Sequence, residues 1–278
     1  MYNFHTHSNF CDGTGAPEEY VLSALGKGFK SLGFSGHAPT PIALDWTLTF
    51  ENLNAYFDAI NLLKEKYREK IEIYLGLEFD YYEEKRFQKF YFQTKDRLDF
   101  NISSVHFIYD KRENKFYIID GKIESYIDAL KNIFNENVVN FVSSYYSLVR
   151  KMIVDYSPDI VAHIDLIKKN NRNSTFFSER ANWYKKEILL TLDVLSKSSS
   201  LLEINTGGIA RGSINDFYPS EWLFKECYKR NIPLIINSDS HTPQKIDAYF
   251  EEARKALKKA GYSTQVVLLK NRWTEVEI

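Results

Sequence analysis

The amino-acid sequence predicts an α/β barrel of seven strand–helix units, formed by a single domain that spans residues 1–278. Short apolar runs alternate with amphipathic stretches of helical length, and no Pro-, Gly- or Ser-rich linker or repeat of constant period interrupts the alternation. The length of 278 residues suits one barrel of this kind. Side chains that can bind metals follow the apolar runs, at the strand ends where such barrels carry their active sites.

Seven apolar runs are predicted to form the barrel strands. Most are continuously apolar, which is typical of parallel strands buried on both faces. The predicted strands are residues 2–5, 31–37, 71–79, 100–107, 160–163, 201–205 and 233–237. Segment 110–114 lies between two further β-like runs and predicts a hairpin or an excursion above the sheet.

Helices are predicted between the strands. Pro17, with Glu18 and Glu19, begins the first helix, which ends near Gly28 in the usual arrangement of an initial proline and a final glycine. Apolar residues at helical spacing predict helices over residues 53–67, 181–195 and 242–261. Two further helices are predicted over residues 83–95 and 138–156.

Composition narrows the possible functions. The formal net charge of −1 provides no basic field for nucleic acid and no polybasic membrane patch. No apolar run approaches the roughly 20 residues that span a bilayer, and the N-terminal segment lacks the features of a signal peptide. Cys11 and Cys227 form no CxxC or zinc-finger spacing. We therefore expect a cytoplasmic enzyme, whose oligomeric state no feature of the sequence predicts.

All six histidines lie in short motifs that are typical of metal ligands, and three carboxylates have similar settings. Five of the histidines end an apolar run, and the sixth follows two residues after the first. The nine residues are His5, His7, Asp12, His37, Glu78, His106, His163, Asp239 and His241. Nine such ligands at the ends of different elements predict a multinuclear metal site.

Two pairs of these residues strengthen the prediction. His5 and His7 are two residues apart on an extended segment, so their side chains point the same way and can bind one ion. Asp239 and His241 repeat this spacing at the last strand. Two such pairs at opposite ends of the alternating pattern are hard to explain unless both contribute to one metal site.

Each remaining residue also has an ordinary structural interpretation. Glu78 ends a buried strand, where a carboxylate needs a partner, and could be a salt-bridged core residue instead of a bridge between two ions. His106 and His163, taken singly, are typical of core histidines. Asp12 precedes Gly-Thr-Gly and is also an ordinary turn residue. Their joint occurrence favours the metal interpretation.

Four segments in this order, HTH, GFSGHAP, SSVHF and NSDSH, resemble the polymerase and histidinol phosphatase (PHP) family of metal-dependent phosphoesterases. The resemblance covers nearly the whole chain. It is strongest to the histidinol-phosphate phosphatases, with which the chain shares FCDGTG, SVHF, an INTGG-like segment, YPS and SDSHTP. It implies a distorted seven-stranded (β/α)7 TIM-like barrel with a metal site at the C-terminal ends of the strands.

The resemblance also implies three divalent metal ions. The first would be bound by His5, His7, Glu78 and Asp239. The second would share Glu78 and add His106 and His163. The third would be bound by Asp12, His37 and His241. Mixed imidazole and carboxylate ligands suit Zn, Fe or Mn about equally.

Hydrolysis at such a centre needs no serine or cysteine nucleophile. Neighbouring ions can activate a hydroxide that attacks phosphorus. Cys11 is expected to be a small buried residue. We expect Asp239, His241 and Arg211 to act in catalysis, and either a second coordinated water or Asp239 to protonate the leaving group.

Cationic side chains are expected to bind the phosphate. Arg211, just after strand 201–205, is the main candidate, although a surface arginine in a flexible loop is the alternative. Lys168, Lys169 and Arg172 follow His163 and are the other candidates. Related phosphatases tend to have an arginine soon after the His-x-Asp motif that begins at this histidine. In this chain the first basic residues after the motif are lysines.

Three aromatic residues are expected to line the substrate's organic half: Trp46, Phe107 and Tyr218. Asp165 is expected to orient a metal ligand.

The function that the resemblance implies is hydrolysis of L-histidinol phosphate to L-histidinol and phosphate, a reaction of histidine biosynthesis. A related phosphoesterase that acts on nucleotides or other small phosphate esters is the alternative. Seven rather than eight units and the additional His37 and His106 disfavour an amidohydrolase-type barrel. A complete ligand set disfavours a non-catalytic scaffolding module.

Overall fold

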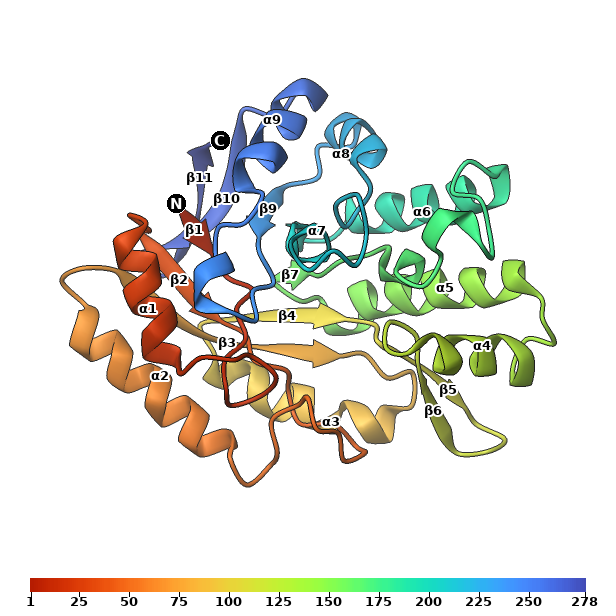
Figure 1. The fold of residues 1–278 in the computed structure, drawn as a ribbon, viewed down its shortest axis with the longest axis horizontal. Helices are drawn as coiled ribbons and strands as arrows, with labels where there is room; N and C mark the ends of the chain where they lie inside the picture. Colours follow the sequence, from red (N-terminus) through yellow and green to blue (C-terminus); the bar gives the residue numbers. More distant parts are fainter.

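A computed structural model describes residues 1–278. The main sheet has seven parallel strands in the order β1-β2-β3-β4-β7-β8-β9 (Figure 1). Each predicted barrel strand contributes one of them, which confirms the prediction of seven units. The strands are β1 (Tyr2–Asn3), β2 (Ser31–Phe34), β3 (Glu72–Asp80), β4 (Phe100–Ser104), β7 (Ile160–Val161), β8 (Leu201–Asn205) and β9 (Leu234–Asn237).

The first and last strands of the sheet meet at their carboxyl ends. Thr6 and Ser240 form an isolated parallel bridge, in which the His7 N–H donates to the Ser240 carbonyl at 2.9 Å. The Ser240 N–H donates in turn to the His5 carbonyl at 3.1 Å. The barrel is therefore nearly closed, and the closing bridge brings the HTH and DSH motifs together.

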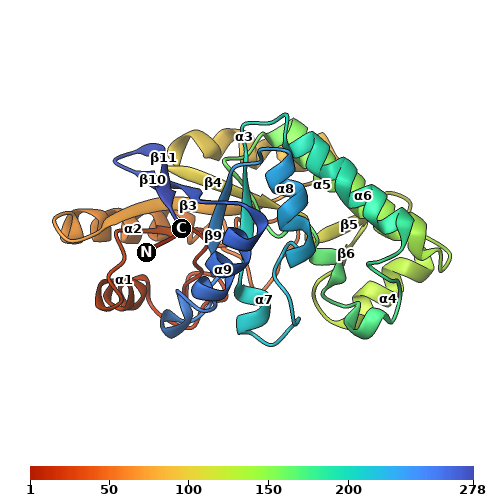
Figure 2. The ribbon, with the colours of Figure 1, turned by 90° about the horizontal axis from the view of Figure 1, so that it is seen from above.

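Helices surround the sheet, and α5 and α6 pack side by side (Figures 1 and 2). Five of them were predicted to within a few residues: α1 (Pro17–Gly26), α2 (Leu53–Tyr67), α3 (Lys85–Thr94), α5 (Val138–Tyr156) and α6 (Asn182–Leu195). Three short helices were not predicted: α4 (Ile123–Asn132), α7 (Gly207–Ala210) and α8 (Phe224–Lys229). None of the helices combines the length and the apolar character that crossing a bilayer requires.

The predicted helix over residues 242–261 is interrupted. A 3-10 turn at Pro243–Lys245 is followed by α9 (Phe250–Ala260), and Tyr249 between them has a φ of 60°. Ile246 and Phe250 are both buried at a spacing of four residues, so the apolar pattern continues across the break and conceals it. Gly261, with a φ of 116°, ends the helix as predicted.

Two hairpins complete the fold. The predicted hairpin is present as β5 (Phe107–Asp110) and β6 (Lys115–Ile118). An unpredicted one, β10 (Thr264–Leu269) with β11 (Arg272–Glu277), lies at the amino end of the barrel strands. The Lys270 N–H at its turn donates to Glu72, the first residue of β3, at 2.7 Å. This hairpin therefore lies opposite the carboxyl ends that hold the predicted ligands.

Candidate metal centre

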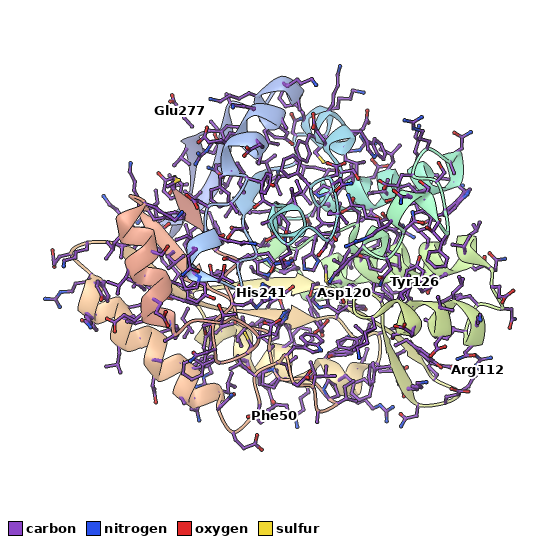
Figure 3. All side chains as sticks on the ribbon, viewed as in Figure 1. Phe50, Arg112, Asp120, Tyr126, His241 and Glu277 are labelled. Carbon is purple, nitrogen blue, oxygen red and sulfur yellow. The ribbon has the colours of Figure 1, made fainter.

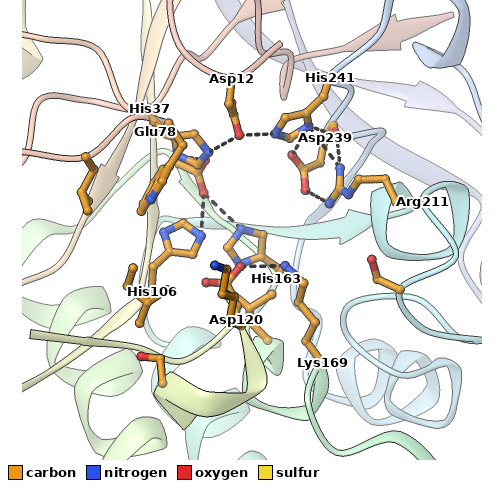
Figure 4. A pocket seen from close by; sticks show the side chains of 18 of the residues that line it. Asp12, His37, Glu78, His106, Asp120, His163, Lys169, Arg211, Asp239 and His241 are labelled. Atoms are coloured by element: carbon orange, nitrogen blue, oxygen red, sulfur yellow. Dashed lines mark hydrogen bonds and ion pairs between the residues drawn. The ribbon is translucent and has the colours of Figure 1, made fainter. Parts of the chain in front are cut away.

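The nine predicted ligands converge at the carboxyl ends of the barrel strands. Seven of them line a cavity of about 620 Å³: Asp12, His37, Glu78, His106, His163, Asp239 and His241 (Figure 4). His5 and His7 lie behind this wall and are fully buried. His241 and Asp120, another residue that lines the cavity, lie in the same central region of the molecule (Figure 3).

Glu78, at the carboxyl end of β3, lies in the middle of the cluster and is 1% exposed. Its Oε2 is 3.1 Å from His5 Nε2 and 3.0 Å from His37 Nδ1. Its Oε1 is 3.1 Å from His163 Nε2 and 3.8 Å from His106 Nε2. The two oxygens thus face different sets of imidazoles, as a carboxylate that bridges two ions would.

Asp239 forms a second meeting point. Its Oδ1 lies 3.2 Å from His7 Nε2 and 3.6 Å from His5 Nε2. Asp239 and His163 have positive φ values of 47° and 22°. Backbone strain of this kind persists where the surrounding structure enforces it, which is frequently at functional sites.

Asp12 lies close to three of the candidate histidine ligands, at the side of the cluster nearest to solvent. Its Oδ2 is 3.0 Å from His241 Nε2 and 3.9 Å from His37 Nε2, and its Oδ1 is 3.6 Å from His7 Nδ1. A Cβ on Gly13 would lie 2.6 Å from the His7 backbone, so glycine is needed for the loop to bring Asp12 this close.

Four overlapping groups of side chains place ligand atoms within 4.8 Å of one another. They are His7, Asp12, His37 and His241; His5, Glu78 and His163; His5, His7 and Asp239; and His37, Glu78 and His106. The predicted third set falls within one group, and three members of the first set form another. His106 and His163 of the predicted second set fall in separate groups. Four residues each belong to two groups: His5, His7, His37 and Glu78. Assignment of each ligand to one of three ions remains a prediction.

Unpaired buried nitrogens test whether a cation fits. His7 Nε2 and His37 Nδ1 are buried and make no hydrogen bond of acceptable geometry. Carboxylate oxygens nevertheless lie close to them, Asp239 Oδ1 at 3.2 Å from His7 Nε2 and Glu78 Oε2 at 3.0 Å from His37 Nδ1. Buried polar atoms are nearly always satisfied, and an imidazole nitrogen aimed between carboxylates is suited to a divalent metal. The donor set and its geometry therefore fit metal ions.

The protonation states of two candidate ligands, Glu78 and His7, also suit metal binding. Burial alone would raise the pKa of Glu78, but His5 and His37 hold that pKa well below its usual value. Burial, reinforced by the neighbouring His241 and His37, lowers the pKa of His7 to about 3. Glu78 is therefore ionised and His7 neutral near pH 7, which are the forms that bind metals.

Glu203, on β8, is a functional residue that the sequence reasoning missed. It is fully buried, and its Oε1 accepts from His5 Nδ1 at 2.6 Å and from Asn237 Nδ2 at 3.0 Å. Its Oε2 accepts from Asn205 Nδ2 at 2.9 Å and from the His163 N–H at 3.2 Å. A donated Nδ1 proton leaves His5 Nε2 free for a metal. The sequence feature that could have identified it is the position of Glu203 inside the apolar run LLEIN, where a carboxylate needs a buried partner.

Asp80 has the same role beside a different ligand. Its Oδ1 lies 2.9 Å from His106 Nδ1, which directs His106 Nε2 towards the centre. Although burial opposes it, Asp80 raises the pKa of His106 to about 10.

Asp165, which was expected to orient a ligand, instead accepts from the Ser220 N–H at 2.9 Å and pairs with Lys168 at 2.8 Å.

Two of the four predicted phosphate-binding residues reach the cavity. Arg211 Nη2 contacts Asp239 Oδ2 at 2.7 Å, and its Nη1 donates to the Asp239 carbonyl at 2.6 Å. A Cβ on Gly207 would lie 2.8 Å from Arg211 Nη1, so glycine makes room for the guanidinium. Lys169 Nζ contacts Asp120 Oδ2 at 2.9 Å.

The other two do not reach it, which corrects that part of the prediction. Lys168 is 5% exposed, and its Nζ is occupied by Asp165 and by the Phe217 carbonyl at 2.7 Å. Arg172 lines a neighbouring cavity and donates to the Gly212 carbonyl at 3.2 Å. Lys168 and Lys169 are adjacent on one turn, so only one of them can face the centre.

Aromatic residues form part of the cavity wall. Trp46 and Tyr218 line it, as expected, whereas Phe107 stacks behind Trp46 with ring centroids 5.9 Å apart.

Burial raises the pKa of the Cys11 thiol to about 12, so Cys11 carries no thiolate at neutral pH.

The chain belongs to the PHP domain family, because a model of that family matches residues 3–207. It is similar to the histidinol-phosphatase of Bacillus subtilis, with 27% identity over 250 residues that cover 85% of this chain and 92% of that protein. The resemblance seen in the sequence motifs is thereby confirmed.

Two solved structures share the fold. A provisionally assigned histidinol phosphatase from Listeria monocytogenes has a TM-score of 0.76 and 24% identity, over 91% of this chain and 99% of that one. The histidinol phosphate phosphatase of Lactococcus lactis has a TM-score of 0.73 and 22% identity, over 98% of both chains. That structure is a complex with zinc, L-histidinol and phosphate. The predicted TIM-like barrel is confirmed.

Proposed function

We propose that this chain is a metal-dependent phosphomonoesterase that hydrolyses L-histidinol phosphate to L-histidinol and phosphate. The observation that carries the proposal is the convergence of nine metal-binding side chains, with Glu78 in their middle, at one cavity that seven of them line and that Arg211 also lines. Similarity to the histidinol-phosphatase of Bacillus subtilis supports the substrate.

We further propose that three divalent ions, Zn, Fe or Mn, are held by the ligand sets predicted from the sequence. The overlapping groups of ligand atoms and the zinc in the Lactococcus lactis protein support this proposal. When bound, such ions would make water nucleophilic at neutral pH and neutralise charge on a phosphoryl group. One continuous sheet from β1 to β9, with the terminal hairpin packed on it, supports a single domain over residues 1–278.

Arg211 and Lys169 would bind the phosphate from one side of the cavity. The Arg211 guanidinium already makes a charge-assisted contact with Asp239, and its planar fork can also contact phosphate oxygens. Its side chain is 34% exposed, so a ligand can reach it. Asp239 and His241, the other predicted catalytic residues, lie next to this guanidinium. They would orient it and the phosphate. Although burial opposes ionisation, Arg211 and His5 hold the pKa of Asp239 well below its usual value, so the leaving alcohol would take its proton from water.

A substrate panel tests the proposal. The metal-loaded protein and a metal-stripped sample are assayed for phosphate release from L-histidinol phosphate, nucleoside monophosphates and a phosphodiester. We expect metal-dependent release with the highest kcat/KM for L-histidinol phosphate. Higher kcat/KM for nucleotides would support the alternative phosphoesterase function, and activity confined to diesters would refute the proposal.

A further inference from the structure

One carboxylate in the cavity has no part in the metal centre. Asp120 lines the cavity but belongs to none of the groups whose ligand atoms could share an ion. The other cavity carboxylates are Asp12, Glu78 and Asp239, which are candidate ligands, and Asp45, which lies exposed on the loop before α2. Asp120 is therefore the one sheltered carboxylate that remains for contact with a substrate.

The backbone holds Asp120 beside the centre. The N–H of the preceding residue, Ile119, donates to the carbonyl of His106 at 3.0 Å. The Ile119 carbonyl accepts from Asn170 Nδ2 at 2.9 Å. The segment before Asp120 is thus attached on one side to a candidate metal ligand and on the other to the loop that carries Lys169.

The Asp120 side chain faces the hollow of the cavity. Figure 4 shows it below His163, across the hollow from Asp12 and His241. It is 19% exposed, and its Oδ2 contacts Lys169 Nζ. No protein group donates to Oδ1, and a carboxylate can accept several hydrogen bonds. Although burial opposes ionisation, Lys169 and His106 keep the pKa of Asp120 below its usual value.

We propose that Asp120 binds the ammonium group of the substrate and makes the site selective for phosphate esters of amino alcohols. This inference rests on the proposed function. In L-histidinol phosphate, the ammonium group is on the carbon next to the ester CH₂. A phosphoryl group held between the metal ligands and Arg211 would leave the ammonium close to the cavity wall. A cation there requires a carboxylate, and Asp120 provides one without disturbing the metal ligands.

A purely positioning role is the competing explanation. Asp120 would then only hold Lys169 for the phosphate, and its loss would affect every phosphate ester equally. The two explanations differ in how the enzyme treats a substrate without an amine. The matched pair of substrates is L-histidinol phosphate and 3-(imidazol-4-yl)propyl phosphate, which lacks only the amino group.

The test measures kcat/KM for both esters in the wild-type protein and in Asp120→Asn, Lys169→Met and Asp45→Asn. The wild type should prefer the amino ester by about 10- to 100-fold, as a charge-assisted hydrogen bond allows. In Asp120→Asn this ratio should fall close to one, mainly through a higher KM for the amino ester. Lys169→Met should lower both values by a similar factor, and Asp45→Asn should retain the wild-type ratio.

Several outcomes would overturn the inference. Equal loss for both esters in Asp120→Asn would show that Asp120 only positions Lys169 or supports the fold. An unchanged ratio, or a wild-type ratio near one, would show that the amine is recognised elsewhere or not at all, and would leave the proposed phosphatase function intact. Hydrolysis of neither ester by the wild type would refute the proposed function and this inference with it. Asp120→Ser, which also removes the charge, should give the same ratio as Asp120→Asn, and the Tm of each variant verifies folding.

Discussion

Glu203 controls the orientation of two candidate ligands without facing the cavity itself. It accepts from the His5 ring and from the His163 backbone, and it is held by two asparagine side chains. A carboxylate in this position makes the imidazole more basic and determines which ring nitrogen faces the metal. The centre is therefore built from two layers of buried side chains.

Replacing Glu203 by glutamine should weaken metal binding. The amide keeps the shape but loses the charge, so we expect the metal affinity to fall by about 10- to 100-fold. Competition with a chelating dye measures this. Glu187→Gln, which alters a partly buried glutamate paired with Arg150 and remote from the candidate ligands, is the control. Wild-type affinity in Glu203→Gln would mean that the carboxylate does not support the ligand.

His106→Ala and Arg211→Ala should have different effects. Removing His106 should lower both metal content and turnover, because His106 is a candidate ligand. Removing Arg211 should leave the metal content at the wild-type level and raise KM roughly 10-fold or more, since a hydrogen bond between charged groups is lost. Metal analysis and steady-state kinetics on the same samples separate the two. A kinetically silent Arg211→Ala would exclude its phosphate role.

Individual ligands were easier to predict than the residues that support them. One histidine at the end of an apolar run is typical of a core residue, but the repetition of this setting along the chain indicates metal binding, and the structure brings all nine predicted residues together. Glu203, Asp80 and Asp120 were missed because their contacts depend on segments far away in the sequence. Lys168 and Lys169 could not be distinguished, since side-chain direction on a short turn is not visible in the sequence.

At the scale of elements, glycines allow the loops to reach the centre. Gly13 lets the loop after β1 pack against the His7 backbone, which places Asp12 near His241. Gly13→Ala should therefore reduce occupancy of the outermost metal position and lower kcat by at least about 10-fold, because a 1 Å misplacement at a site is costly. Metal content per chain and kcat are the measurements.

A second glycine provides the control for this prediction. Gly26, at the end of α1, has no atom within 4 Å of an added Cβ. Gly26→Ala should keep full metal content and activity and should stabilise the helix slightly. If Gly13→Ala were equally harmless, the loop would not depend on that close approach.

Elements with a strong local pattern were predictable, and the others were not. Continuous apolar strands and long amphipathic helices are recognisable by period alone. The helix α7 has only four residues and shows no periodicity. The strand β11 is mostly exposed, so its composition resembles that of a loop. The break before α9 was concealed because buried residues on both sides keep helical spacing.

At the scale of the whole molecule, pH should couple metal binding to stability. Without metal, the pKa of His106 is raised to about 10, so His106 is protonated at pH 7 to 8. A metal ion must displace this proton, so metal affinity should rise with pH. Calorimetry in buffers of different ionisation enthalpy should detect proton release at pH 7.5. Proton uptake or no exchange would contradict the assignment of His106.

The same shift predicts how the metal-free protein responds to alkali. A raised folded-state pKa stabilises the protein fully below the unfolded value of 6.5, and the benefit is lost as pH rises through about 10. The Tm of the metal-free protein should therefore decrease over this interval more than that of the metal-loaded protein.

The near-closed sheet is what makes the centre possible, because it unites the ends of strands from both termini. The most direct test of this account is a titration of divalent metal into stripped protein, with phosphate release from L-histidinol phosphate followed at each addition. We predict no turnover without metal and a rise that saturates near three ions per chain. Full turnover in the presence of a strong chelator would contradict the account.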